Sequence, residues 1–286
     1  MSDEVRDRPA AQHEDSSLTQ IGAGKNEVLL KEALSSEQWD RSDGTPTRLR
    51  YMVFSPQRTG SELLCSHLTQ RGIGMPFEYF NHLFMPKIAR RLGCLGQDGR
   101  IVVARYLSLL EPKRTRNGIF GTKLQPDQLN VLAAGDSERA RSILRRFDKI
   151  ILLRRRDKLL QAISLARARL TNQWQMYRDD PIIRMSTVDR AFFPMIAESL
   201  GKILEDERYI ASFESELNAQ DVRALWYEDL RDSRALDAAA SWLWNAAGGG
   251  TPKPEYDRGH DLPRKMDESE ARGIKERFLA HVGVAG

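Results

Sequence analysis

A short apolar run that leads through a glycine-containing loop into a helix constrains the fold of this chain most strongly. Residues 51–54 (YMVF) form the apolar run, which is typical of a buried strand, and residues 61–71 have helical spacing. The alternation continues, with further strands predicted over 118–124, 149–154 and 222–227 and further helices over 157–174, 184–217, 236–247 and 267–282. This pattern predicts an α/β fold, in which a parallel sheet carries helices on both faces.

Residues 1–48 differ in composition from the rest of the chain. They are mostly polar, so we expect a poorly ordered leader followed by one domain over residues 49–286. The first residues lack the apolar core of a secretion signal, and no apolar run approaches the roughly 18 residues of a membrane span. The chain has two cysteines, which excludes a disulfide framework and a cysteine cluster for a metal, so a cytoplasmic protein is predicted.

The loop at residues 55–60 has the properties of an anion site. A loop between a strand and a helix presents backbone N–H groups at the positive end of the helix dipole. Arg58 adds a cation, and Thr59 and Ser61 add hydroxyl donors around Gly60. A plain alternative is a turn followed by a helix that Ser61 caps. The nucleotide-binding sequence GxxxxGK[ST] is not found in the loop, which argues against an ordinary ATPase or GTPase.

A second junction of the same kind follows the predicted strand at 149–154. Arg155 stands at the end of the strand, and Ser164 lies on the helix that starts at Asp157. A guanidinium and a hydroxyl in these positions can hold a second phosphate, whereas in the alternative the arginine is solvated and Asp157 only begins the helix. Two such junctions suit a ligand with two separated phosphates. The net charge of +4 either favours an anionic ligand or only keeps the surface soluble.

Three motifs in order along the chain resemble a known enzyme family. They are QRTGS at residues 57–61, GMPFEYF at residues 74–80 and RxDxxxQAxSL at residues 155–165. Together they are similar to the bacterial carbohydrate sulfotransferases, the family of trehalose 2-sulfotransferase and the rhizobial lipopolysaccharide sulfotransferases. The resemblance implies a sulfotransferase-type fold similar to that of P-loop NTPases. It also implies 3′-phosphoadenosine 5′-phosphosulfate (PAPS) as the sulfuryl donor and no metal, and members of this family are often homodimers.

The resemblance further implies roles for individual residues. Glu78 would be the general base that takes the proton of the acceptor hydroxyl. The residues that would hold the donor nucleotide are Arg58, Thr59, Gly60 and Ser61 at the 5′-phosphosulfate, Arg155 and Ser164 at the 3′-phosphate, and also Lys123 and Arg264. The residues that would contact the acceptor are Gln57, Met75, Phe77, Tyr79, Phe80 and Asn81.

The general base and the acceptor leave alternatives open. The apolar neighbours of Glu78 would strengthen it as a base if it is buried, but His82 and His67 are rivals because an imidazole accepts protons near neutral pH. His67 lies within a predicted helix and is expected to pack or to face solvent instead. Met75 and Phe77 are apolar where trehalose-specific members of the family have polar residues. A more apolar alcohol, such as a glycolipid, therefore fits at least as well as trehalose.

Two other functions compete with sulfuryl transfer. A kinase or another NTPase could use the same loop, although GK[ST] is missing. A nucleic-acid-binding protein could use a basic stretch that contains few aromatic residues for base stacking: Arg141, Arg145, Arg146, Arg154, Arg155 and Arg156. We expect a PAPS-dependent sulfotransferase that acts on a small-molecule or lipid-linked alcohol, and we expect no nucleic-acid partner.

Overall fold

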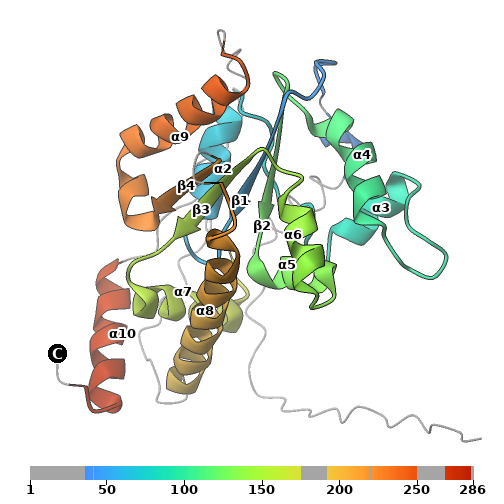
Figure 1. Ribbon diagram of the computed structural model, residues 1–286. Helices are drawn as coiled ribbons and strands as arrows, with labels where there is room; N and C mark the ends of the chain where they lie inside the picture. The colour runs from blue at the N-terminus through green and yellow to red at the C-terminus, as the bar shows by residue number, and fades with distance from the viewer. Residues whose placement is uncertain (1–35, 41, 175–191, 219–220, 250–267, 285–286) are drawn as a thin grey trace, which may run out of the picture.

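The computed structural model describes residues 36–40, 42–174, 192–218, 221–249 and 268–284. Within them, the centre is a parallel sheet of four strands in the order β2-β1-β3-β4 (Figure 1). The strands are β1 (Leu49–Phe54), β2 (Ile119–Leu124), β3 (Lys149–Arg154) and β4 (Val222–Trp226). Phe54 is in register with Leu124 on β2 and with Leu152 on β3. The predicted α/β fold is confirmed.

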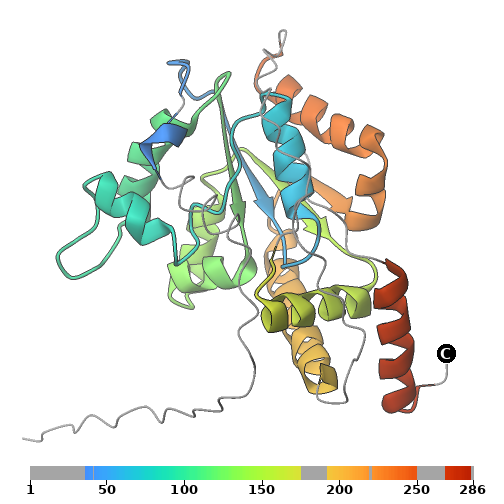
Figure 2. The same ribbon diagram turned by 180° about the vertical axis from the view of Figure 1, so that it is seen from behind.

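Helices cover both faces of the sheet (Figures 1 and 2). One face packs against α2 (Ser61–Gln70) and α9 (Ser233–Ala246). The other packs against α3 (Met85–Arg91), α4 (Val103–Arg114), α5 (Pro126–Ala133), α6 (Ser137–Leu144) and α8 (Phe192–Glu214). Tyr51 and Val53 of β1 lie in the first core, and Met52 and Phe54 lie in the second. Because both faces are buried, the strand reads as a continuous apolar run.

A third apolar cluster lies beyond the carboxyl ends of the strands. There α7 (Lys158–Thr171) and α10 (Glu268–His281) pack with α8 (Figure 1). α7 begins directly after β3, and the side chain of Asp157 caps it by accepting from Leu160 N at 2.9 Å. The cluster therefore holds α7 across the end of the sheet at which ligands bind in open α/β folds. None of the described helices is both long and apolar enough to cross a membrane.

Some elements differ from the sequence-based expectation. Helices α3 to α6 lie between residues 85 and 144, where the apolar pattern predicts only the strand that became β2. α3, α5 and α6 have only seven or eight residues, so a helical period repeats over few turns, whereas α4 has twelve residues with Pro112 inside it. α8 (Phe192–Glu214) lies within the helix predicted over residues 184–217, and residues 184–191 lie outside the described part of the chain. Pro194 lies in the first turn of α8, where its missing N–H costs no helical hydrogen bond.

The end of the predicted leader belongs to the domain. A 3₁₀ turn, η1 (Glu37–Trp39), buries the side chain of Trp39. Asp40 then pairs with Arg91 of α3 at 2.5 Å and with Arg114 of α4 at 3.2 Å. The side chain of Arg114 is fully buried and requires this counter-charge. The boundary predicted at residue 48 is therefore too late, while residues 1–35 lie outside the described part of the chain.

The strand order brings two loops together at the carboxyl ends of the neighbouring strands β1 and β3. The chain runs from β1 to β2 on one side, and β3 lies on the other side of β1, so the order reverses at β1. In open α/β sheets, ligands bind outside the carboxyl ends of the strands at such a reversal. The loop at residues 55–60, after β1, and the turn at residues 155–157, after β3, both lie at this point.

Candidate functional site

The loop after β1 leads into α2 through two left-handed residues. Arg58 has a φ of +62°, and Gly60 has a φ of +79° at the N-cap position of α2. The alternative in which Ser61 caps the helix is wrong, because Ser61 is the first helical residue and Gly60 has no side chain to serve as a cap. The first turn of α2 thus keeps its backbone N–H groups for a partner other than a capping side chain, as an anion site requires.

Two hydroxyl side chains of this loop are buried. Thr59 donates to the carbonyl of Pro56 at 3.1 Å and so stabilises the turn. Ser55 is 1% exposed, and its Oγ has no hydrogen-bond partner among the described residues. A buried hydroxyl of this kind is unfavourable until a polar group meets it. The loop is therefore chemically suited to a bound anion.

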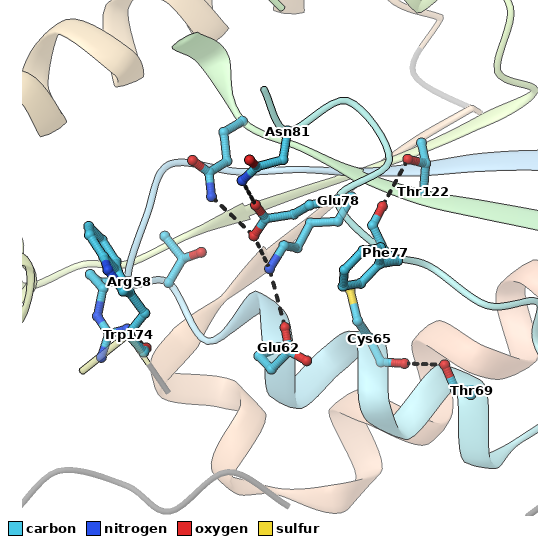
Figure 3. Close-up of polar contacts among 12 residues, drawn as sticks. Arg58, Glu62, Cys65, Thr69, Phe77, Glu78, Asn81, Thr122 and Trp174 are labelled. Carbon is cyan, nitrogen blue, oxygen red and sulfur yellow. Dashed lines mark hydrogen bonds and ion pairs between the residues drawn. The ribbon is translucent and has the colours of Figure 1, made fainter. Parts of the chain in front are cut away.

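The side chain of Arg58 joins the two junctions. Its Nε donates to Ser164 Oγ of α7 at 3.0 Å. Its Nη1 donates to the carbonyl of Trp174, which lies beside Arg58 in Figure 3. Arg58 and Ser164 are the residues expected at the two opposite phosphates of the nucleotide. The structure places them in direct contact, with the guanidinium of Arg58 turned toward the second junction.

Arg155, at the end of β3, stacks on an aromatic ring. Its guanidinium lies 4.4 Å from the centroid of Tyr227, and its Nη1 donates to the carbonyl of Arg58 at 3.5 Å. Tyr227 begins η2 (Tyr227–Arg231) and covers Gly60, where an added Cβ would lie 2.7 Å from Tyr227 Cδ2. The arginine of the second junction thus touches the loop of the first, both directly and through this ring.

Glu78 is held by polar side chains. Its carboxylate contacts Lys123 Nζ at 2.7 Å and accepts from Asn81 Nδ2 at 2.8 Å and Gln128 Nε2 at 3.2 Å (Figure 3). Gln125 Nε2 donates to it at 3.4 Å. The expectation of apolar surroundings is wrong, because the main chain of the motif passes through apolar residues while the carboxylate faces these donors. The carboxylate thus has a donor at each of its two oxygens, Lys123 at Oε1 and Asn81 and Gln128 at Oε2.

Lys123 is a buried cation at the centre of this arrangement. Its side chain is 7% exposed, and its Nζ lies 2.7 Å from Glu78 and 3.3 Å from Glu62 of α2. Burial by itself lowers the pKa of Lys123, but the two carboxylates outweigh burial and raise that pKa above its usual value. The ammonium that was expected to reach the nucleotide is therefore paired with two carboxylates.

The segment at residues 75–81 is anchored to the end of β2. The carbonyl of Phe77 accepts from Lys123 N at 2.9 Å and from Thr122 Oγ1 at 3.1 Å. Because Phe77 is fixed in this way, the next residue, Glu78, is brought beside the Lys123 side chain.

The residues expected to contact the acceptor fall into two groups. Tyr79 and Phe80 are buried in the core, and the hydroxyl of Tyr79 donates to the carbonyl of Met75 at 2.7 Å. These three buried side chains stabilise the segment. The other three expected residues are partly exposed and can face an acceptor: Gln57, Phe77 and Asn81.

The two rival histidines lie apart from the contacts of Glu78. His67 of α2 contacts Asp237 of α9 at 3.1 Å, so it packs between helices as expected. Burial lowers the pKa of His67, although Asp237 acts in the opposite direction. His82 is exposed in the turn after the segment. Among these expected bases, Glu78 is the one connected to the anion loop, through Lys123 and Glu62.

Sequence reasoning missed three residues of the site. Gln125 and Gln128 begin α5 directly after β2, and Gln125 N donates to Gln128 Oε1 at 3.1 Å, which turns the NH₂ group of Gln128 toward Glu78. Glu62 follows Ser61 in the first turn of α2. Their position just after a strand end or the anion loop is the signal that could have found them. Arg264, expected at the nucleotide, lies outside the described part of the chain.

The donor set fits a ligand with two anionic ends. The first end would meet the loop at residues 55–60, with the buried hydroxyl of Ser55 and the first turn of α2. The second would meet Arg155 and Ser164, which are buried side chains at the end of β3 and on α7. Arg58 lies between these two groups of donors.

Several solved structures are similar to this chain at low identity. The sulfotransferase domain from the curacin biosynthetic pathway is 15% identical, with a TM-score of 0.40 over 84% of this chain and 99% of that one. The sulfotransferase domain from the Synechococcus PCC 7002 olefin synthase is 17% identical, with a TM-score of 0.42 over 84% and 96%. Retinol dehydratase in complex with androsterone and the inactive cofactor PAP is 15% identical, with a TM-score of 0.34 over 87% and 85%.

No curated protein matches the sequence. The family model of the Stf0 sulphotransferase matches residues 50–207, a range that contains β1 from its second residue, β2, β3 and the residues around Arg58, Glu78 and Arg155. The match spans more than half of the chain. The chain therefore belongs to the Stf0 sulphotransferase family.

Proposed function

We propose that the protein is a PAPS-dependent sulfotransferase that transfers a sulfuryl group to the hydroxyl of an alcohol. Membership of the Stf0 family supports sulfuryl transfer. The observation that carries the proposal is the meeting of two groups of anion donors at one edge of the sheet, joined by the 3.0 Å contact between Arg58 and Ser164. A donor nucleotide with a phosphate at each end matches this pair of sites.

The chain offers separate donors for the two ends of the nucleotide. PAPS supplies the sulfuryl group on its 5′-phosphate. The loop at residues 55–60 and the first turn of α2 would hold that end with backbone N–H groups. Arg155 and Ser164 would hold the 3′-phosphate, and Arg58, which lies between the two junctions, can donate to either end.

Glu78 would act as the general base. Its carboxylate takes the proton of the acceptor hydroxyl while the hydroxyl oxygen bonds to sulfur, and such a base typically contributes about 10²–10⁴-fold. The backbone N–H groups of the loop and Arg58 stabilise the negative charge that develops on the leaving phosphate oxygen. Asn81, Gln128 and Lys123 hold the Glu78 carboxylate in place.

The partly exposed residues near Glu78 favour an acceptor with both polar and apolar parts. Gln57 and Asn81 supply amides, and Phe77 supplies an aromatic ring. Amides pair with sugar hydroxyls, and an aromatic ring packs against an apolar group. A carbohydrate, a glycolipid or another lipid-linked alcohol therefore suits the site.

The competing functions have weaker support. Three arginines of the basic stretch are paired with acids: Arg141 with Glu216 at 2.6 Å, Arg154 with Glu207 at 3.1 Å, and Arg156 with Asp229 at 2.8 Å. This pairing reduces the positive charge available to a nucleic acid. A kinase would need the missing GK[ST] sequence after the loop.

A thermal-shift experiment separates the donor classes. We expect adenosine 3′,5′-bisphosphate to stabilise the protein without Mg²⁺, by about 2.7 kcal/mol at a concentration of 100 times its Kd. Stabilisation by Mg·ATP alone would contradict the proposal and favour a kinase. Incubation of purified protein with PAPS and a cell extract then identifies the acceptor, through a product whose mass is increased by one sulfuryl group.

A further inference from the structure

Lys123 connects two carboxylates that come from different parts of the site (Figure 3). Glu78 belongs to the segment at residues 75–81, and Glu62 belongs to the first turn of α2, next to the anion loop. The Nζ of Lys123 is 2.7 Å from Glu78 Oε1 and 3.3 Å from Glu62 Oε2. The side chain of Lys123 is 7% exposed, compared with 16% for Glu78 and 29% for Glu62. A buried cation is therefore shared by the expected base and by a second acid.

This arrangement bears directly on proton transfer. A buried ammonium is stable only beside negative charge. When Glu78 accepts a proton, its carboxylate becomes neutral, and its ion pair with Lys123 becomes an ordinary hydrogen bond. If Glu78 were the sole partner, each proton transfer would leave Lys123 buried without a counter-charge. That cost would oppose the action of Glu78 as a base.

Four further side chains near this pair, those of Cys65, Asn81, Gln125 and Gln128, add no charge to it. Cys65 of α2 is titratable, but burial raises the pKa of its thiol, so the thiol stays protonated. Asn81, Gln125 and Gln128 contact Glu78 through uncharged amides. In the described part of the chain, Glu62 is the other carboxylate that pairs with Lys123.

We propose that Glu62 is a positioning residue that acts through Lys123 and keeps the ammonium paired while Glu78 carries the acceptor proton. The inference rests on the proposed role of Glu78 as general base. The proton passes from the acceptor hydroxyl to Glu78 and then to water, while Lys123 keeps its own proton and Glu62 keeps its charge. Glu62 itself touches no reacting atom. It allows Glu78 to change its charge because it keeps a negative charge beside Lys123.

Substitutions that mimic protonated Glu78 test whether Glu62 keeps Lys123 charged when Glu78 is neutral. Glu78→Gln places a neutral group of the same shape beside Lys123, and we expect Lys123 to stay protonated to alkaline pH in this variant and also in Glu62→Gln. In the double variant, both charges are gone, and the titration midpoint of Lys123 is expected to fall by about 3–5 pH units. The measurement is the NMR chemical shift of Lys123 Cε across pH in the full chain. Glu138→Gln removes a charge from α6 at a side chain that is 74% exposed and serves as the control.

Two results of the Lys123 titration would overturn the proposal. The proposal is overturned if Lys123 loses its proton as readily in Glu78→Gln as in the double variant, or if it stays protonated to alkaline pH in the double variant. If the double variant does not fold, Lys123→Met is added to it. Recovery of the melting temperature then identifies the unpaired ammonium as the cause and supports the proposal, whereas a triple variant that stays unfolded contradicts it.

Kinetics distinguish positioning from a merely structural role. With PAPS as the donor and water as the acceptor, Glu62→Gln is expected to lower kcat roughly 10-fold. It should also move the acid limb of the pH profile to lower pH, because Glu78 then no longer shares Lys123 with the second carboxylate seen in the described part of the chain and is held more firmly ionised. The affinity for adenosine 3′,5′-bisphosphate should be unchanged or higher, and Glu62→Asp should retain most of the turnover.

Failure of this inference is distinguishable from failure of the proposed function. Equal losses of turnover and of nucleotide affinity in Glu62→Gln would indicate a structural role and contradict the inference. The titration of Lys123 needs no sulfuryl transfer, so it tests the charge pairing even if the wild-type protein does not bind the nucleotide. Absence of nucleotide binding by the wild-type protein would instead overturn the proposed function.

Discussion

The guanidinium of Arg155 stacks over the ring of Tyr227, 4.4 Å from its centroid, and the same ring covers Gly60 in the anion loop. A contact of this kind contributes about 0.5–2 kcal/mol, depending on how well it is shielded from water. The ring and the carbonyl of Arg58, to which Arg155 Nη1 donates at 3.5 Å, together fix the orientation of the guanidinium. The two junctions of the site are thereby held at a constant separation.

Arg155→Ala is expected to weaken the binding of adenosine 3′,5′-bisphosphate far more than the binding of adenosine 5′-phosphosulfate, because the second nucleotide lacks the 3′-phosphate. A lost hydrogen bond to a charged group corresponds to an affinity decrease of about 10–100-fold. Titration calorimetry with both nucleotides measures the difference. Arg156→Ala, at an arginine that pairs with Asp229 outside the site, is the matched control. Equal losses for both nucleotides would remove Arg155 from the 3′-phosphate site.

Gly60→Ala should disrupt the anion loop. The added Cβ would lie 2.7 Å from Tyr227, and the residue would be held at a φ of +79°, which costs about 1–2 kcal/mol for a residue with a side chain. We expect a lower melting temperature and loss of adenosine 3′,5′-bisphosphate binding. Gly135→Ala is the control, since Gly135 has a φ of +75° with no atom within 4 Å of the added Cβ. If the two variants bind the nucleotide equally well, close packing at Gly60 is not required.

Glu78→Gln should keep nucleotide affinity and lower turnover about 10²–10⁴-fold, because the amide retains the shape of the side chain but cannot take a proton. Turnover is measured with the acceptor identified from the extract, and binding with adenosine 3′,5′-bisphosphate. His82→Gln, at the exposed rival histidine, should leave turnover near the wild-type value. Near-normal transfer by Glu78→Gln would show that another residue is the base.

Asp40→Asn should destabilise the domain. The substitution removes the carboxylate that pairs with Arg91 and with Arg114, whose side chain is fully buried and lies 5.5 Å from the ring centroid of Tyr79. Removal of one partner of a buried ion pair costs about 3–5 kcal/mol of unfolding free energy. Chemical denaturation measures the change. Asp98→Asn breaks an exposed pair with Arg100 and should change stability by less than about 1 kcal/mol. A similar small change in both variants would contradict this role for Asp40.

Asp206 of α8 should make the free energy of unfolding decrease as the pH rises. Burial raises the pKa of Asp206 to about 6, although its partner Lys202 acts to lower it. The folded protein therefore binds this proton more tightly than the unfolded chain, whose value is 3.8. The stabilisation from this proton is fully present below about pH 4 and is lost as the pH rises through about 6.

Asp206→Asn removes this titration. Relative to the wild type, the variant should lose less stability as the pH rises from about 4 to about 6, as measured by melting temperature across pH. Glu198→Gln, on the same helix at a side chain that is 75% exposed, should follow the wild-type curve. Parallel curves for Asp206→Asn and the wild type would contradict the raised pKa.

Local sequence patterns predicted much of the fold and part of the site. β1, β3 and α7 follow from apolar runs, helical spacing and the cap at Asp157, because these signals act between neighbours in the chain. Helices α3, α5 and α6 were not predicted because each has only seven or eight residues and is stabilised by the core that it covers. The polar contacts of the Glu78 carboxylate were not predicted for a related reason. The apolar residues next to Glu78 in the sequence are not the residues that its carboxylate contacts in space.

The sequence by itself determined that two loops with anion donors follow apolar strands, and that a glutamate lies in an aromatic motif between them. The tertiary structure alone decided which of these residues meet. Arg58 contacts Ser164 across 106 positions of sequence, and Lys123 reaches Glu62 across 61. Both contacts depend on the order in which β2, β1 and β3 lie in the sheet. Periodicity determines which segments become strands, but their order is set by packing between segments that are distant in the chain.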